Sequence, residues 1–124
     1  MNKVVHFEIP ADNLGRAKIF YASVFGWTTQ DFGEDVSLVT TVESDDNGPK
    51  IPGAINGDLY KRTSTNPHPS VVMDVDSIDD YLKKIEAAGG KVIKEKQEMA
   101  GMGYYASFAD TEGNTLGLWE SIKK

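Results

Sequence analysis

Residues 4–12 read Val-Val-His-Phe-Glu-Ile-Pro-Ala-Asp, and the prediction of the fold starts from this stretch. Its apolar residues Val5, Phe7 and Ile9 alternate with His6 and Glu8. A period of two predicts a β-strand whose two faces meet different surroundings. Because the apolar face is expected to pack in the core, His6 and Glu8 must lie on the opposite face of the sheet.

The hydrophobic period changes directly after this strand. Residues 10–13 break the strand, and Asp12 or Asn13 is suited to cap a helix. Apolar residues then recur at the spacing of an amphipathic helix, and Gly26 is a typical residue to end one. The residues that define this spacing are Leu14, Ala17, Tyr21 and Val24.

The strand and the helix occur a second time, 64 residues further along the chain. At this offset Asp12 falls on Asp76 and Gly26 falls on Gly90. One strand and helix at matching spacing can arise by chance. However, the strand, the cap, the helix and the glycine stop all coincide, which favours a repeated unit.

Three strand-like runs follow each predicted helix. They cover residues 27–30, 36–42 and 51–59 in the first half, and residues 91–95, 104–108 and 115–120 in the second. The order βαβββ therefore occurs twice. It predicts an α+β fold of two modules, about residues 1–60 and 70–124, joined by a proline-containing linker at residues 61–69. The free faces of their curved mixed sheets are expected to form a concave cleft.

Composition narrows the possible functions. A chain of 124 residues suits one domain, and the absence of cysteine excludes disulfides and thiolate chemistry. The net charge of −6 argues against a nucleic-acid partner, which usually needs a basic face. No apolar run approaches the roughly 18 residues of a membrane span. We therefore expect a soluble cytoplasmic protein with neither a nucleic-acid nor a membrane partner.

Two stretches resemble a known superfamily. Residues 5–12 with Phe20-Tyr21 and Phe25-Gly26-Trp27 are similar to the opening of vicinal-oxygen-chelate proteins, the glyoxalase, bleomycin-resistance and extradiol-dioxygenase group. Residues 110–114 and 116–120 resemble the family's last turn and strand, with Thr111 in place of the usual proline. The resemblance implies paired βαβββ modules and a homodimer. It is weak for chemistry, because this family contains lyases, dioxygenases, epimerases and binding proteins.

The resemblance also implies where a metal would bind. Metal-dependent members carry one ligand on the first strand and one on the last strand of each module. These positions fall on His6 and Ser70 in the first strands, and near Gly53 and on Gly117 in the last strands. Only His6 matches, so we expect neither a divalent metal nor another cofactor. His68 is not expected to serve as a further metal ligand, because Pro67 and Pro69 on either side of it favour a loop.

The remaining candidates suit an organic ligand. Glycine in a pocket floor leaves space, and an aromatic ring beside it offers a flat apolar wall. The predicted ligand-binding residues are His6, Glu8, Ser70, Val72, Tyr105, Gly117 and Trp119, and the predicted catalytic residues are His6 and Glu8. The alternative for each is a structural role in a pocket wall or in the core. Residues 97–103, with two methionines and two glycines, are either a flexible lid or a disordered loop without function.

Three functions remain open at this point. The leading expectation is metal-independent binding of a small organic molecule in the concave cleft. The second is a lyase or isomerase that uses His6 or Glu8 as a base, whereas a dioxygenase is not expected. The third is a regulatory or interaction subunit with a vestigial cleft.

Overall fold

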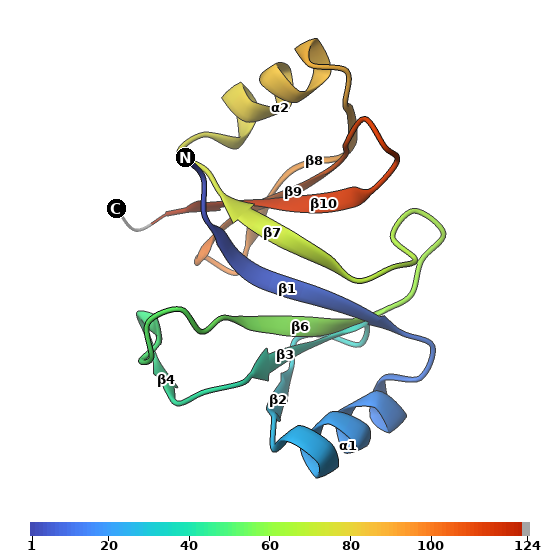
Figure 1. The fold of residues 1–124 in the computed structure, drawn as a ribbon, viewed down its shortest axis with the longest axis vertical. Helices are drawn as coiled ribbons and strands as arrows, with labels where there is room; N and C mark the ends of the chain where they lie inside the picture. Colours follow the sequence, from blue (N-terminus) through green and yellow to red (C-terminus); the bar gives the residue numbers. More distant parts are fainter. Residues whose placement is uncertain (123–124) are drawn as a thin grey trace. The chain divides into compact units, whose positions relative to one another are not determined.

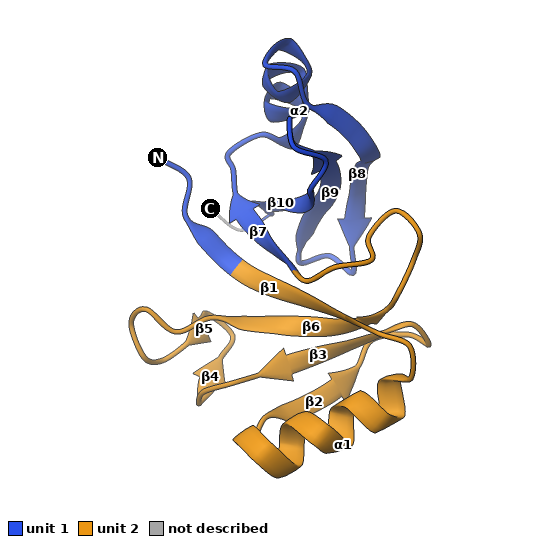
Figure 2. Cartoon of the chain, turned by 45° about the vertical axis from the view of Figure 1, so that its right-hand side comes forward, with its two compact units in different colours: residues 1–5, 70–124 blue, residues 6–69 orange. Residues whose placement is uncertain are grey.

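The computed structural model describes residues 1–122, and its class is α+β, as predicted. The chain divides into two compact units (Figure 2). Unit 2 comprises His6–Pro69, and unit 1 comprises Met1–Val5 together with the chain from Ser70 onwards. The predicted second module ran to residue 124, and its last two residues lie outside the described residues.

Unit 2 contains one helix and a four-stranded mixed sheet. The strands follow the order β2-β3-β6-β1, in which β6 pairs antiparallel with β3 and parallel with β1 (Figure 1). A short hairpin, β4 and β5, stands apart from this sheet. The elements are β1 (Val4–Ala11), α1 (Leu14–Phe25), β2 (Thr28–Asp31), β3 (Val36–Thr40), β4 (Ser44–Asp45), β5 (Gly48–Pro49) and β6 (Asn56–Lys61).

Unit 1 has the corresponding arrangement. Its strands follow the order β7-β10-β9-β8, with β10 parallel to β7 and antiparallel to β9. The first residues of the chain belong here, because Lys3 accepts a hydrogen bond from the Asp74 amide through its carbonyl oxygen. The elements are β7 (Ser70–Asp74), α2 (Ile78–Ala87), β8 (Lys91–Met99), β9 (Gly103–Ala109) and β10 (Thr115–Ser121).

Helix α1 begins and ends as the sequence indicated. The side chain of Asn13, rather than Asp12, caps it by accepting a hydrogen bond from the Arg16 amide. Gly26 ends it in the left-handed conformation, with φ of 72°. On its sheet side, Tyr21 stacks on Trp27 with ring centroids 4.9 Å apart, and Phe7 lies against the same indole.

Helix α2 covers the main hydrophobic core. Ser77 caps it, and the Ile78 amide also donates a hydrogen bond to the Glu120 carboxylate. The core residues alternate along β9 and β10, so one face of that sheet packs under the helix. They are Val75, Ile78, Leu82, Ala106, Phe108 and Leu118.

The turn between β9 and β10 is built around one carboxylate. Asp110 accepts hydrogen bonds from the Glu112 and Asn114 amides and from the Asn114 side chain. The bonds from Asn114 hold the pKa of the Asp110 carboxyl below its usual range. Gly113 has φ of 82°, which a residue with a side chain rarely adopts. The replacement of proline by Thr111 therefore leaves the turn intact.

Several strand boundaries differ from those predicted. Residues 51–53 form a turn, so the last strand of unit 2 begins at Asn56 rather than at residue 51. Residues 43–50, between two predicted strands, contain the short β4–β5 hairpin. β8 continues to Met99, because its polar residues still pair with β9 through backbone hydrogen bonds and register shifts. Among the described residues, no helix is long and apolar enough to cross a membrane.

Candidate ligand-binding site

The sheet face of unit 2 that points away from α1 collects polar side chains. In the parallel pair of β1 and β6, Glu8 lies opposite Asp58 and Pro10 lies opposite Tyr60. Residues opposite each other in such a pair share a face, and so do residues two apart on a strand. His6, Glu8, Asp58 and Tyr60 therefore lie on one face of the sheet. We call these four residues the polar face.

His6 and Asp58 form the central contact of the polar face. The His6 Nε2 atom lies 2.8 Å from the Asp58 Oδ2 atom. In the tautomer that donates this hydrogen bond, Nδ1 is the nitrogen able to accept a proton. The carboxylate thereby orients the imidazole, as it does in base–orienter pairs of enzymes.

The second oxygen of Asp58 has no hydrogen-bond partner. Asp58 is only 7% exposed, and its Oδ1 atom is buried. A buried acceptor without a donor costs roughly 1–3 kcal/mol, so such atoms are rare in folded proteins. Among the described residues, this atom is thus an acceptor without a donor.

Glu8 adds a second carboxylate to the same face. It is 8% exposed and lies directly beside Asp58 in the strand register. Two buried carboxylates on adjacent strands favour groups that donate hydrogen bonds or carry positive charge. Their effect is visible at Tyr60, where burial first, and then the charges of Glu8 and Asp58, raise the pKa to about 12.

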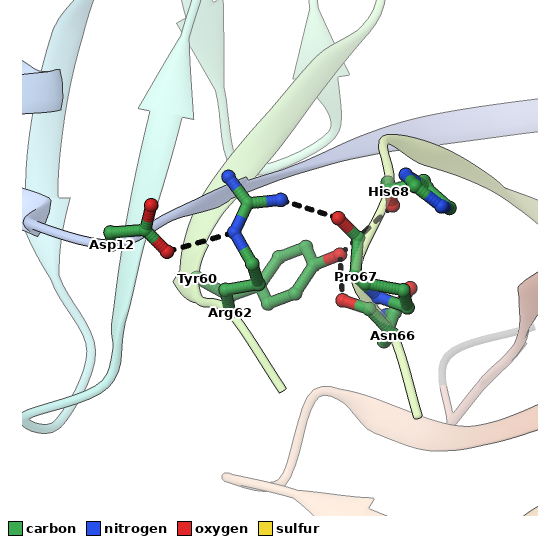
Figure 3. Close-up of polar contacts among 6 residues, drawn as sticks. All are labelled: Asp12, Tyr60, Arg62, Asn66, Pro67 and His68. Carbon is green, nitrogen blue, oxygen red and sulfur yellow. Dashed lines mark hydrogen bonds and ion pairs between the residues drawn. The ribbon is translucent and has the colours of Figure 1, made fainter. Parts of the chain in front are cut away.

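Tyr60 also anchors the segment that follows β6. Its hydroxyl lies 2.9 Å from the Asn66 carbonyl oxygen and 3.1 Å from that of His68 (Figure 3). Arg62 adds hydrogen bonds to the Asp12 carboxylate and to the Pro67 carbonyl oxygen (Figure 3). These contacts fix residues 62–69 as a loop, and His68 lies in it, exposed and outside any strand, as the flanking prolines indicated.

The corresponding face of unit 1 differs, because aromatic side chains lie against its glycines. Val72 lies opposite Gly117, and Tyr105 lies opposite Trp119. A Cβ atom on Gly117 would come within 2.8 Å of the Tyr105 ring and 3.0 Å of Val72. The space beside the Gly117 Cα atom is therefore occupied by Tyr105 from the neighbouring strand β9. The predicted role of Gly117 in a pocket floor stays a prediction.

Trp119 lies close to a second glycine, Gly103, as Tyr105 lies close to Gly117. A Cβ atom on Gly103 would lie 2.4 Å from the Trp119 indole. Tyr105 and Trp119 lie on neighbouring strands of unit 1, each close to a glycine, and together with Val72 and Gly117 we call them the aromatic face. Ser70, at the start of β7, is two residues before Val72 and is also buried.

The structure corrects one position carried over from the family. Gly53 lies in a turn with φ of 87°, so it cannot be the last-strand residue of unit 2. The repeat places Glu8 on Val72, whose strand partner is Gly117. The strand partner of Glu8 is Asp58, which is therefore the residue that corresponds to Gly117.

Asp58 and Tyr60 were missed because the two halves differ in the length of their hairpins. The 64-residue offset holds through the helix and becomes 59 residues at the last strand. One signal was available: Leu59-Tyr60 and Leu118-Trp119 both place an aliphatic residue before an aromatic one. Aligning these pairs sets Asp58 on Gly117.

The donors in unit 2 do not amount to a metal centre. With Asp58 included, His6 and Asp58 are the two donors at the family's positions, and Ser70 and Gly117 stand at the others in unit 1. Divalent sites normally use three or more protein ligands. Within residues 1–122, no group of three or more His, Asp or Glu side chains is placed to hold a metal ion. The residues present do not fit the family's metal site.

Two other features lie away from these faces. The predicted lid at residues 97–103 is the end of β8 and a tight turn into β9, in which the Met102 amide donates to the Met99 carbonyl oxygen. A shallow hollow of about 610 Å³ lies between α2 and β8. Lys96 and Asp79 in its lining form an ion pair, and none of the predicted site residues lines it.

Comparison with known proteins establishes the family. The profile of the Glyoxalase/Bleomycin resistance protein/Dioxygenase superfamily matches residues 3–118, so the chain belongs to this superfamily. It is 25% identical over 125 residues to the anthracycline biosynthesis protein DnrV of Streptomyces peucetius, and 24% identical to DauV of Streptomyces sp. (strain C5). Each alignment covers 91% of this chain and 45% of the relative, so the chain spans about half the length of these curated relatives.

Solved structures share the fold at low identity. Methylmalonyl-CoA epimerase from Streptomyces coelicolor, in complex with 2-nitronate-propionyl-CoA, matches with a TM-score of 0.67 and 16% identity, over 99% of this chain and 96% of that one. A hypothetical protein from Bacillus halodurans C-125 matches with a TM-score of 0.66 and 15% identity, with the same coverage. Similarity at this level concerns the fold alone.

Proposed function

We propose that this protein binds a small organic molecule that donates hydrogen bonds to the polar face of unit 2, without a metal. The observation that carries the proposal is the Asp58 Oδ1 atom, which is buried and has no donor. A ligand hydroxyl or protonated amine would supply that donor. Hydrogen bonds to charged groups contribute about 1.5–3 kcal/mol, which corresponds to roughly a tenfold or greater gain in affinity.

Three properties define the expected ligand. Glu8 and Asp58 favour a neutral or cationic molecule over an anion, because both carboxylates are buried beside each other. His6 adds a group that exchanges a hydrogen bond with either a donor or an acceptor. The curated relatives are named for anthracycline biosynthesis, so fused-ring aromatic molecules with hydroxyl groups are the first class to test.

The test is a titration with an anthracycline such as daunorubicin, followed by calorimetry and by quenching of tryptophan fluorescence. We expect saturable binding that persists in EDTA, and at least about tenfold weaker binding by Asp58→Asn. The matched control is Asp46→Asn, which removes the same charge from an exposed position in the β4–β5 hairpin. Equal affinity of Asp58→Asn and the parent protein would refute the role of the polar face, and loss of binding in EDTA would refute metal independence.

A second function follows from the His6–Asp58 pair. An imidazole oriented by a carboxylate is suited to remove a proton from a carbon next to a carbonyl group, as a lyase or isomerase does. The proton would pass to His6 Nδ1, and return of a proton to the same carbon would complete an isomerisation. Deuterium uptake from D₂O into a bound ligand, lost in His6→Ala, would favour this enzyme; saturable binding without exchange would favour the binding protein.

A further inference from the structure

The chain contains the dipeptide Asn-Gly twice, and the structure places the two copies in opposite surroundings. The first copy is Asn47-Gly48 and the second is Asn56-Gly57. An asparagine before glycine can deamidate, because the glycine amide nitrogen attacks the asparagine side-chain carbonyl carbon without hindrance from a β-carbon. Since the two copies share this local chemistry, a large difference between their reactivities would come from the fold.

Asn47-Gly48 lies in an exposed turn with room for this reaction. Asn47 is exposed between β4 and β5, and Gly48 has φ of 107°. In the described part of the chain, no atom beyond the adjacent residues would lie within 4 Å of a Cβ atom on Gly48. The backbone amide of Asn47 donates to the Asp45 carboxylate, whereas the Asn47 side chain makes no hydrogen bond within residues 1–122.

The hairpin that carries Asn47 is only marginally held together. Each of its strands has two residues, and they pair with each other apart from the main sheet. An isolated two-stranded hairpin is marginally stable in water, so this turn can open while the rest of the protein stays folded. The Gly48 nitrogen can therefore reach the Asn47 side chain in the folded protein.

Asn56-Gly57 is instead locked in the sheet of unit 2. The Asn56 side chain accepts a hydrogen bond from the Thr41 amide and donates one to the Ser44 hydroxyl, each 2.9 Å long. Gly57 is buried in β6, which pairs with β1 on one side and β3 on the other. A Cβ atom on Gly57 would strike the Phe7 ring. Attack at this site requires β6 to leave the sheet, which costs more than opening the hairpin.

We propose that Asn47 is a site of spontaneous deamidation in the folded protein, because the β4–β5 hairpin leaves it free to react. The Gly48 nitrogen loses its proton and forms a bond to the Asn47 Cγ atom. The bond between Cγ and Nδ2 breaks, and ammonia leaves. Water then adds to either carbonyl carbon of the resulting succinimide ring and opens it, which leaves aspartate or isoaspartate at position 47. Water is the only co-reactant, and nothing is oxidised or reduced.

The reaction changes the hairpin in two ways. Either product adds a negative charge next to Asp46, in a chain whose net charge is already −6. Isoaspartate also adds a carbon atom to the backbone of the turn, so the pairing of Asp45 with Gly48 is lost. The Asn56 side chain ties the hairpin to β6, so the altered turn adjoins the strand that carries Asp58.

Peptide mapping by mass spectrometry tests the proposal on the full chain. Trypsin cleaves after lysine and arginine, so it separates Asn47 in peptide 19–50 from Asn56 in peptide 51–61, and each peptide contains a single asparagine. After incubation in mildly alkaline buffer, we expect an amide-to-acid mass gain at least about tenfold faster at Asn47 than at Asn56. In urea, where both sites lose their structure, the two rates should come within about threefold of each other.

The control variant is Asn47→Gln. It keeps an amide at the same position, but its longer side chain closes a ring less readily on the Gly48 nitrogen. The mass gain of peptide 19–50 should therefore disappear. If it persists, the other amide of this peptide, Gln30, is the reacting group and the assignment to Asn47 fails.

Each outcome decides for or against the hairpin as the cause. A fast reaction at Asn47 and a slow one at Asn56 in the folded chain, with similar rates in urea, support it. Equal rates in the folded chain overturn it, and so does an Asn47 that reacts only in urea. A preference for Asn47 that persists in urea also overturns it, because the local sequence would then be sufficient. No ligand enters the experiment, so its result is independent of the proposed binding function.

Discussion

The two units have the same strand order and pairing, but they carry different chemistry on the face opposite their helices. Asp58 in unit 2 and Gly117 in unit 1 hold equivalent positions in the register. The first is a buried carboxylate with an unpartnered oxygen, and the second is covered by an aromatic ring. The strands pair through their backbones whether Asp58 or Gly117 stands at this position, because these hydrogen bonds do not involve the side chain. Function is therefore free to diverge on this face while the fold is kept.

The two helices also differ in which side chains they bury and which they expose. α2 buries Ile78 and Leu82 and exposes charged residues such as Asp79 and Glu86. α1 buries no residue fully and exposes a strip of apolar ones. An exposed apolar patch usually marks a contact with another molecule. Unit 2 thus carries both the polar face and an exposed apolar strip on α1, whereas unit 1 carries the main hydrophobic core.

Among the substitutions that test this difference between the units, the largest loss of stability is expected when Gly117 of the aromatic face receives a side chain. Gly117→Ala places a Cβ atom 2.8 Å from the Tyr105 ring, so the ring or the strand must shift. Overpacking of this kind costs about 1–3 kcal/mol of the free energy of unfolding. Urea unfolding followed by circular dichroism measures the loss.

A second substitution identifies the cause of that loss. Tyr105→Ser removes the ring that the new methyl group would strike, so Gly117→Ala should cost less in that background than in the parent. Additive losses in the double variant would show that the aromatic ring is not what constrains Gly117, and the description of the aromatic face would fail.

The sequence predicted the class of fold from local patterns. Alternation at Val5, Phe7 and Ile9 put His6 and Glu8 on the face away from the helix, where the structure has them. The caps at Asn13 and Ser77 set the two helix starts because short polar side chains satisfy the first amides. These signals are local, so a single sequence is sufficient to reveal them.

The remaining site residues could not be found from local patterns. Asp58 was missed because its assignment depends on which strand pairs with β1, and the β4–β5 hairpin changes the spacing before β6. The glycine at position 117 predicted space, but only tertiary packing shows that Tyr105 fills it. β8 was cut short because its exposed face offers no hydrophobic signal beyond Glu95, while backbone pairing continues.

A smaller loss of stability is expected from Tyr60→Phe, since Tyr60 anchors the loop that follows β6. Tyr60→Phe removes a hydroxyl that donates to the carbonyl oxygens of residues 66 and 68, which should cost about 1 kcal/mol near pH 8. In the parent protein, burial and two carboxylates raise the pKa of Tyr60 to about 12. A tyrosine in the unfolded chain ionises near pH 10. The folded state therefore holds a proton that the unfolded state has released, and the parent loses stability as the pH rises from 10 to 12.

This loss is absent in Tyr60→Phe, so the order of stability should change with pH. A pKa of about 12 in the folded state, against about 10 in the unfolded chain, corresponds to roughly 2–3 kcal/mol of the free energy of unfolding, which exceeds the loss of the hydrogen bonds. Urea unfolding at pH 8 and pH 12 should show the parent more stable at the lower pH and the variant more stable at the higher. The other four tyrosines are common to both proteins and cancel in the difference. A constant difference across this range would contradict the raised pKa.

The smallest expected change in stability, and the sharpest separation of fold from function, comes from Asp58→Asn. The amide keeps an oxygen that can accept the hydrogen bond from His6 Nε2, and its NH₂ group can donate to the neighbouring Glu8 carboxylate. It also removes one of two adjacent buried negative charges, so we expect the free energy of unfolding to rise by about 0.5–1 kcal/mol. Urea unfolding at neutral pH measures this change, with the exposed Asp46→Asn as the control. Binding of the anthracycline should move in the opposite direction, because the acceptor that the ligand needs has become a donor. A more stable protein that binds less well would mean that Asp58 is kept for its ligand at a cost to the fold, whereas a loss of more than about 1 kcal/mol would make Asp58 a structural residue and leave the polar face without its main argument.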